Sequence, residues 1–233
     1  MKTIDVCLSP DLMHLYDVRP RTVVVVDVLR ATSCMVTAFA HGAQSITPYA
    51  DLKACQSAGS QGFITCGERD GRKVEGFDKG NSPFEYMGED IRGRKIAFTT
   101  TNGTEAIERA KSAKKLIVGS FVNLSAVVKA ISGGEDSVLV VCAGWKGRMG
   151  LEDVLFAGAV VEHAKDHFSL ECDAPLAAQH LYNVARGDMM KFLADSAHVK
   201  RLARLNIQKD IEFCLTPDRY DVVPALVDGV LVT

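Results

Sequence analysis

The chain of 233 residues is 47% hydrophobic and 24% charged, the composition of a globular protein. Its 27 Lys and Arg residues against 29 Asp and Glu residues give a formal net charge of −2, which argues against a dedicated nucleic-acid-binding protein. So apolar a chain also excludes intrinsic disorder, because burial of apolar surface offsets the entropy lost on folding. The length predicts one large domain or two small ones.

The seven cysteines are odd in number and scattered, without a Cys-x-x-Cys pair, which is typical of a reducing compartment rather than of a disulfide framework. The N-terminal residues MKTIDVCLSPDL contain no long apolar core of a signal peptide. No uncharged apolar run approaches the roughly 18 residues that span a bilayer. We therefore expect a cytoplasmic protein that does not enter a membrane.

Short apolar runs alternate along the chain with longer segments of helical period. The run 22–28 (TVVVVDV) is almost entirely β-branched, which is typical of a buried parallel strand. A helix is predicted at 32–41, with Thr32 or Ser33 as its N-cap. Further strands are predicted at 61–66, 95–100, 115–119 and 137–143, and further helices at 51–58, 102–112, 122–132 and about 151–165. This alternation predicts an α/β/α fold, a mostly parallel sheet sandwiched by helices.

The C-terminal third has a different pattern. Residues 173–205 indicate two or three helices, and the last stretch, IEFCL followed by YDVVPALVDGVLVT, indicates one or two closing strands. The Gly-rich segment 67–80 carries charges of both signs, which favours a functional loop over a domain boundary. Because no linker is visible, we predict a single α/β domain over 1–233, within which about 166–233 could form a sub-lobe.

Chemistry is expected beyond the carboxyl ends of the parallel strands, where the following loops converge. Five loops carry hydroxyls, small residues or charges at that position. Loop by loop in chain order, these residues are Asp27, Arg30, Thr32 and Ser33; Glu68 and Arg69; Thr100, Thr101, Asn102, Gly103 and Thr104; Ser120 and Asn123; and Cys142, Gly144, Lys146, Arg148, Glu152 and Asp153.

Asp27 ends an apolar strand, where a carboxylate is costly to desolvate unless it is paired or binds a metal. It could form a salt bridge to Arg30 or cap a helix, or it could bind Mg²⁺, which takes one or two carboxylates with water and substrate oxygens. Glu68 beside Arg69 offers the same two roles. The segment 100–104 opens a helix with hydroxyls and backbone N–H groups, which is either an ordinary N-cap or a phosphate cradle.

Two segments fit the Cys-x₅-Arg spacing of a cysteine phosphatase, Cys142 to Arg148 and Cys66 to Arg72. In such a loop the thiolate attacks phosphorus and the Arg holds the phosphoryl oxygens. Cys142 has the better context, because a strand-like run precedes it and a helix follows. A core or pocket-lining cysteine is the alternative, which the bulky Trp145 favours.

Other ionisable residues are expected in solvent. The six histidines form no metal-binding His-Glu-x-x-His motif, and the acidic residues near the C-terminus are interpreted as solvated charge. These residues are His14, His41, His163, His167, His180, His198, Asp210, Glu212, Asp218 and Asp221.

Together, several of these segments resemble the 2-phosphosulfolactate phosphatase family. The matching stretches are 23–43, 67–86, 97–107, 118–128 and 140–162, with a weaker match at 210–229. The resemblance implies an α/β/α fold unlike the common phosphatase folds. It also implies an Mg²⁺-dependent acid phosphatase that releases sulfolactate and phosphate, a step of coenzyme M biosynthesis.

The resemblance extends to individual polar positions. Asp27 would serve the metal and Arg30 an anionic group. Two departures are Met149-Gly150, where an aromatic-Ser pair is more usual, and Ala197-His198-Val199, where a His-Gly turn is frequent. The other matching positions are Glu68, Arg69, Asn81, Ser82, Thr100, Thr101, Asn102, Gly103, Ser120, Glu152 and Asp153.

These observations lead to a hypothesis for the site. Mg²⁺ held by Asp27, Glu68 and Asp153 would clamp a phosphoryl oxygen and orient a water, and Asp153 or Glu152 would manage protons. The candidate catalytic residues are Asp27, Glu68, Glu152, Asp153 and Cys142. The candidate substrate-binding residues are Arg30, Thr32, Arg69, Asn81, Ser82, Thr100, Thr101, Asn102, Gly103, Thr104, Ser120, Gly144 and Arg148, helped by Lys146.

Three alternatives stay open at this stage. The enzyme could form a covalent phosphoenzyme on Cys142 or Asp27, the protein could bind small phosphorylated or sulfonated acids without catalysis, or it could be a phosphatase for another substrate. The partner is in each case a small anionic acid, and a homodimer is the default assembly.

Overall fold

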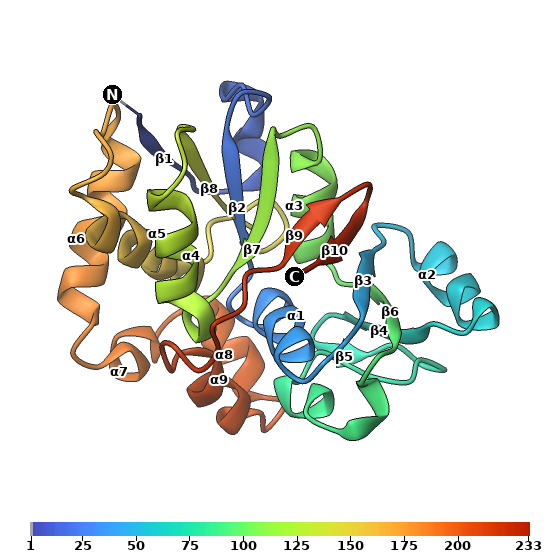
Figure 1. The fold of residues 1–233 in the computed structure, drawn as a ribbon. Coiled ribbons are helices and arrows are strands. Elements are labelled where there is room, and N and C mark those ends of the chain that lie inside the picture. The colour runs from blue at the N-terminus through green and yellow to red at the C-terminus, as the bar shows by residue number, and fades with distance from the viewer. Residues whose placement is uncertain (1) are drawn as a thin grey trace.

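The computed structural model describes residues 2–233 and contains a 10-stranded sheet in the order β1-β8-β2-β7-β9-β10-β3-β6-β4-β5 (Figure 1). The strands are β1 (Ile4–Cys7), β2 (Thr22–Val26), β3 (Ser45–Pro48), β4 (Ile64–Arg69), β5 (Arg72–Lys73), β6 (Lys95–Thr99), β7 (Lys115–Gly119), β8 (Val138–Cys142), β9 (Ala225–Val227) and β10 (Val230–Val232).

The sheet consists of two parallel parts joined by the C-terminal hairpin. Strands β1, β8, β2 and β7 are parallel neighbours, and so are β3, β6 and β4. Strand β9 pairs antiparallel with β7, and β10 pairs antiparallel with β3. The α/β fold with a mostly parallel sheet is therefore confirmed, and so are the closing strands within YDVVPALVDGVLVT.

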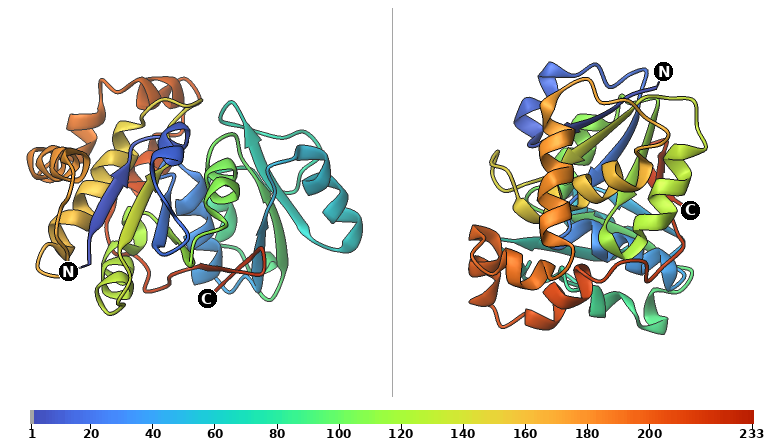
Figure 2. Two further views of the ribbon diagram at one scale, coloured as in Figure 1. Left: turned by 90° about the horizontal axis from the view of Figure 1, so that it is seen from above. Right: turned by 90° about the vertical axis from the view of Figure 1, so that its left-hand side faces the viewer.

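The helices follow the strands as an α/β pattern requires. They are α1 (Ala31–Ala40), α2 (Leu52–Ala58), α3 (Gly103–Ala110), α4 (Leu124–Ser132), α5 (Leu151–Ala164), α6 (Asp173–Ala185), α7 (Met189–Leu193), α8 (Ala197–Ala203) and α9 (Gln208–Cys214). Short 3₁₀ turns are η1 (Pro10–Leu15), η2 (Gly59–Gln61), η3 (Pro83–Tyr86), η4 (Glu89–Ile91) and η5 (Phe121–Asn123). Helices α6 and α2 lie at opposite ends of the molecule (Figure 2).

Some sequence predictions were wrong in detail. The IEFCL segment belongs to helix α9 rather than to a strand, because a short apolar run does not distinguish the two and here it buries Ile211, Phe213 and Cys214 on one side. Strands β1, β3 and β5 were not predicted. The Gly-rich segment forms a hairpin between β4 and β5 whose turn residues, Asp70 and Gly71, both have positive φ.

The core is built around strands that are buried on both faces. Every residue of β2 and β8 is buried, which explains their continuous β-branched and apolar sequence. Helix α5 is buried over most of its circumference, since it packs on β8, α4 and α6. Within residues 2–233, no helix is both long and apolar enough to cross a membrane. The sub-lobe at about 166–233 stays a prediction.

Gly158 allows the close packing of α5 on α6. A Cβ atom at this position would lie 2.0 Å from the carbonyl oxygen of Ala178. Because that atom belongs to the backbone of α6, the clash is relieved only if the two helices move apart. We therefore expect G158A to lower the free energy of unfolding by about 2 kcal/mol in urea denaturation, despite the better helix propensity of Ala. G187A is the matched control, because a Cβ there meets nothing within 4 Å. Equal stability of the two variants would contradict this packing.

Candidate active site

A small cavity lies where the carboxyl ends of β2, β4, β6 and β8 meet helix α8. It is lined by Leu29, Arg30, Glu68, Gly71, Asn81, Asn102, Trp145, His198, Arg201 and Leu202. Its volume of about 20 Å³ has room for roughly one water molecule. Four of the five predicted loops thus contribute to one site, as expected for an open parallel sheet.

The loop after β2 is organised by Asp27. Its Oδ1 accepts a hydrogen bond from the backbone N–H of Ala31 at 3.2 Å. The Thr32 hydroxyl accepts one from the N–H of Asp27 at 3.0 Å and donates to its carbonyl at 2.8 Å. The prediction of Thr32 as the N-cap was therefore wrong, since α1 begins at Ala31 after Arg30. Of the roles left open for Asp27, its bond to the first N–H of α1 is a capping contact, whereas a salt bridge to Arg30 is not formed. The fully buried Thr32 hydroxyl is not free to bind substrate.

Asp27 is a buried acid among other acids. Burial raises its pKa from 3.8 to about 6, against the opposing charge of His198, and the carboxylates of Glu68 and Glu152 raise it further. Its second oxygen, Oδ2, accepts no hydrogen bond from residues 2–233 and faces the start of α3. There a Cβ at position 103 would lie 2.8 Å from it, which explains the glycine.

Asp153 joins two of the loops. Its Oδ1 accepts from the N–H of Val28 at 2.8 Å and its Oδ2 from the N–H of Gly144 at 2.9 Å. Burial raises its pKa well above the usual range, and the charges of Glu152 and Asp27 add to that effect. The carboxylate therefore holds the turn after β2 against the turn after β8.

Glu68 performs a similar task on the other side of the cavity. It lies within β4 rather than beyond its end, because the strand begins and ends three residues later than the predicted 61–66. Its Oε2 accepts from the N–H of Gly71 at 2.6 Å and its Oε1 from the N–H of Thr101 at 2.9 Å. Both oxygens are thus engaged in fixing the β4–β5 turn and the turn after β6.

The turn after β6 was interpreted from the sequence as either an ordinary N-cap or a phosphate cradle. The hydroxyls of Thr100 and Thr104 are used inside the turn, each accepting from the backbone N–H of the other residue. The amide oxygen of Asn102 accepts from the N–H of Lys146 at 3.0 Å. The Thr101 hydroxyl is buried without a partner. Only Thr101 and Asn102 therefore keep free polar groups in this turn.

Two of the predicted anion-binding arginines already have partners. Arg30 is buried, forms an ion pair with Asp210 and donates to the Gly71 carbonyl at 3.2 Å. Asp210 is also bound by the Ser82 hydroxyl at 3.1 Å. The interpretation of Asp210 as solvated charge was wrong, because it neutralises Arg30. Arg69 donates at 2.7 Å to the Glu68 carbonyl, and also to Thr99.

His198 and Glu152 form a buried pair. The Nδ1 atom of His198 lies 2.5 Å from Oε1 of Glu152, and their side chains are only 11% and 1% exposed. The interpretation of His198 as a surface residue was wrong, since α8 brings it over the cavity. The second oxygen of Glu152, Oε2, is buried and has no partner.

Trp145 and Arg201 were missed from the sequence. The Arg201 guanidinium lies over the Trp145 ring, 3.6 Å from its centroid, and its Nη2 atom is buried without a hydrogen-bond partner. Burial lowers the Arg201 pKa. The sequence did contain one signal for Arg201: it follows His198 by three positions, which places both side chains on one face of a helix.

Three predicted contributors do not face the cavity. Cys142 is fully buried in β8 and burial raises the pKa of its thiol well above the usual range, whereas a nucleophilic cysteine needs an accessible thiolate. The Ser120 hydroxyl is fully buried in a capping box with Asn123. Arg148 is exposed. These positions therefore have structural or surface roles.

The unsatisfied polar atoms gather at this site. Of the five buried side-chain N and O atoms without a partner in residues 2–233, four belong to the cavity and its turns: Asn81 Oδ1, Thr101 Oγ1, Glu152 Oε2 and Arg201 Nη2. An unpaired buried polar group costs roughly 1–3 kcal/mol. Such groups at one place are typical of a site that a polar ligand completes.

The oxygen atoms present suit a hard divalent cation. Between Lys2 and Thr233, no three His, Cys, Asp or Glu side chains are grouped so that they could hold a metal by themselves. Mg²⁺ needs only one or two carboxylates, however, and completes its shell with water and substrate oxygens. Asp27 Oδ2 and Glu152 Oε2 are carboxylate oxygens left without hydrogen bonds, so the donor set fits Mg²⁺.

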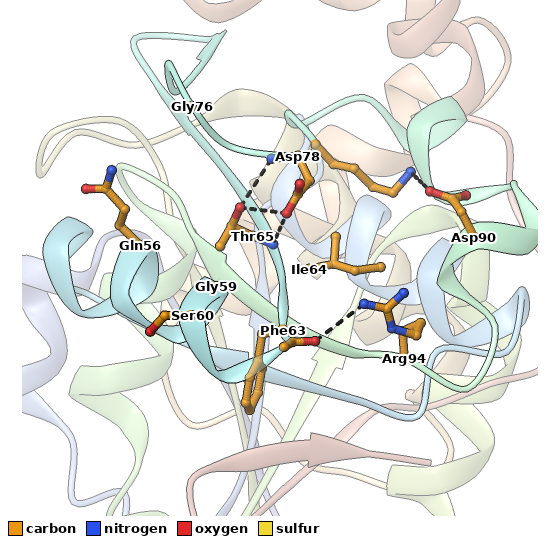
Figure 3. Close-up of a pocket in the computed structure, with 12 residues that line it drawn as sticks. Gln56, Gly59, Ser60, Phe63, Ile64, Thr65, Gly76, Asp78, Asp90 and Arg94 are labelled. Carbon is orange, nitrogen blue, oxygen red and sulfur yellow. Dashed lines mark hydrogen bonds and ion pairs between the residues drawn. The ribbon is translucent and has the colours of Figure 1, made fainter.

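A roomier cavity of about 520 Å³ lies at the opposite, amino end of β4 (Figure 3). Its charged groups are already engaged. Asp78 accepts from Thr65 at 2.8 Å, Lys79 pairs with Asp90 at 2.6 Å, and Arg94 donates to the Gly62 carbonyl at 3.4 Å. Size alone therefore does not mark the functional site.

The fold and the site define a mostly parallel α/β protein with a buried acidic site at the carboxyl edge of its sheet. The chain belongs to the 2-phosphosulpholactate phosphatase family, whose model matches residues 7–229. A probable 2-phosphosulfolactate phosphatase of Thermotoga petrophila is 44% identical over 229 residues, covering 98% of this chain and 97% of that protein. The proteins of the same description from Thermotoga maritima and Caldanaerobacter subterraneus are 43% and 38% identical, covering 98% and 93% of this chain and 97% and 92% of their own lengths. The resemblance seen in the sequence is confirmed.

The buried Asp27 makes a test of the site's electrostatics. Because its folded-state pKa is raised from 3.8 to about 6, ionisation of Asp27 lowers the free energy of unfolding as pH rises through this range, by an amount on the order of a few kcal/mol. In metal-free buffer we expect D27N to be more stable than wild type at pH 7 and equal to it below pH 4, as measured by urea denaturation. The exposed Asp17, whose pKa is lowered by Arg19, is the control: D17N should change the profile in the opposite direction. If the stability of D27N and of wild type changed with pH in parallel, burial would not raise the pKa of Asp27.

Proposed function

We propose that this protein is an Mg²⁺-dependent phosphatase that hydrolyses the phosphate monoester of 2-phospho-3-sulfolactate to 3-sulfolactate and phosphate. Family membership and the descriptions of the relatives support the phosphatase activity. The observation that carries the proposal for this chain is the group of four unpartnered polar atoms around buried carboxylates at one edge of the sheet.

The carboxylates divide into two kinds. Glu68 and Asp153 each accept two backbone hydrogen bonds and so position loops. Asp27 and Glu152 keep one free oxygen each, and these two residues would hold the cation. When bound, Mg²⁺ would offset the charge of the phosphoryl group and of the surrounding acids. The sequence-based ligand set of Asp27, Glu68 and Asp153 is thereby revised in our proposal.

The Glu152–His198 pair supplies a group that can move a proton. Glu152 accepts the Nδ1–H of His198, which fixes the ring orientation and leaves Nε2 for the substrate. As water bonds to phosphorus and the P–O bond to C2 of the substrate breaks, Nε2 would donate its proton to the leaving oxygen. The attacking water leaves one hydrogen on the released phosphate, and its other proton restores His198 over the cycle.

The reducing, cytoplasmic setting, the place in coenzyme M biosynthesis and the homodimer stay predictions from the sequence. A covalent route through Cys142 is not favoured, because its thiol is buried within β8.

The experiment that tests the proposal is a phosphate-release assay on small phosphorylated acids with Mg²⁺ or with EDTA. Phosphosulfolactate should be turned over at least tenfold more efficiently than phospholactate or phosphoglycerate, with activity lost in EDTA and restored by Mg²⁺. C142A should keep kcat within about threefold of wild type, since Cys142 is a core residue. Activity that survives EDTA but disappears in C142A would establish the cysteine route instead.

His198 can be tested separately from substrate binding. H198N removes the proton donor, so kcat should fall by roughly 100-fold with little change in KM, and E152Q should lower kcat in the same direction by disturbing the ring. H167N is the control, because His167 is exposed in the turn that follows α5. A wild-type kcat in H198N, with an unchanged thermal midpoint, would remove His198 from the reaction.

A further inference from the structure

Arg201 is an arginine without an anionic partner at a site where the other arginines are committed. Its guanidinium makes no ion pair within residues 2–233. Burial lowers its pKa, and the charges of Glu152, Asp70 and Glu68 only partly oppose that effect. Its Nη2 atom is buried and donates to nothing. Arg30, by contrast, is neutralised by Asp210.

Trp145 fixes where this guanidinium lies. The indole ring covers one face of the Arg201 guanidinium, and the Nζ atom of Lys146 lies 5.0 Å from the centroid of the same ring. Two hydrogen bonds hold the turn that carries Trp145. The backbone N–H of Trp145 donates to the Arg148 carbonyl at 2.8 Å, and the backbone N–H of Lys146 donates to the amide oxygen of Asn102. A stacked guanidinium is held in plane while the N–H groups at its edge stay free for an oxyanion.

We propose that Arg201, positioned by Trp145, binds the sulfonate of the substrate and so determines its specificity. This inference rests on the proposed function and names which group of the substrate this residue recognises. His198 and Arg201 are one turn apart on the same face of α8, about 5–6 Å between Cβ atoms. In the substrate, the leaving oxygen is on C2 and the sulfonate on the adjacent C3, so the two groups match the two side chains.

Chemistry also favours the sulfonate over the phosphate as the partner of Arg201. A sulfonate is permanently ionised and weakly hydrated, and the guanidinium is the protein cation that is most weakly hydrated and always charged. The phosphoryl group would instead lie on the side of Asp27 and Glu152, the residues that would hold the cation. Arg201 is more exposed than Glu152, so it belongs to the outer part of the site.

The kinetic test compares substrates that differ only in this group. In R201Q, KM for phosphosulfolactate should rise roughly 30-fold, as expected for loss of a charge-assisted hydrogen bond, while kcat stays within about threefold. The kcat/KM for phospholactate, which lacks the sulfonate, should stay within about threefold of wild type. R201Q should therefore lose the preference for phosphosulfolactate over phospholactate. R204Q, at the exposed end of the same helix, is the matched control.

Trp145 is tested as the positioning residue by rescue. W145F keeps an aromatic face and should hold KM for phosphosulfolactate within about threefold, whereas W145A should raise it as R201Q does. An equal loss on phosphosulfolactate and phospholactate in R201Q, or no change on either, would overturn the assignment.

Binding can be measured without turnover, because Trp145 is the one tryptophan of the chain. Sulfolactate should change the intrinsic fluorescence of wild type but not of R201Q, and lactate at the same concentration should change neither. A response to inorganic phosphate that R201Q abolishes would assign Arg201 to the phosphoryl group and overturn our inference. The two proposals can also be separated. If the protein bound sulfolactate through Arg201 but released no phosphate from phosphosulfolactate, the proposed function would be refuted and the sulfonate site at Arg201 would still be supported.

Discussion

Two backbone hydrogen bonds to the buried carboxylate of Asp153 connect the turns that follow β2 and β8. Glu68 makes the equivalent connection between the β4–β5 turn and the turn after β6. Loops from different parallel strands can form one site only if something holds them together, and in this protein acidic side chains do so by accepting N–H groups. Burying an acidic side chain at this edge is costly, in agreement with the raised pKa of Asp153 and of the neighbouring Asp27.

This arrangement determines which groups are left for a ligand. Asp210 neutralises Arg30, and the carbonyl of Glu68 and the Thr99 hydroxyl bind Arg69, so these arginines act as structural cations. Helix α8 closes the cavity from a distant part of the chain with a histidine held by Glu152 and an arginine stacked on Trp145. The interior thus combines free carboxylate oxygens with one free guanidinium edge, a combination suited to a substrate that carries both a phosphoryl group and a second anion.

The sequence was sufficient for the buried parallel strands at the centre of the sheet and for most of the edge where the site lies, but not for β1, β3 and β5. Runs of β-branched residues such as that of β2 have few other interpretations, and the strand-end rule then points to Asp27, Glu68 and Asn102. It was insufficient where long-range packing decides. Asp210 and His198 look like ordinary surface residues of helices, and only the tertiary fold brings them to Arg30 and Glu152. Hydroxyls such as those of Thr32 and Ser120 were overvalued, because a free hydroxyl and one used inside its own turn have the same local sequence.

The central claim is that the ligand lies beneath α8, between the free oxygens of Asp27 and Glu152 and the edge of Arg201. A crystal structure of the protein with Mn²⁺ and sulfolactate measures this directly, since Mn²⁺ scatters anomalously and occupies sites that suit Mg²⁺. We expect an anomalous peak coordinated by Asp27 and Glu152, with the sulfonate oxygens against the Arg201 guanidinium. An anomalous peak or ligand density elsewhere, such as in the cavity at the amino end of β4, would contradict it.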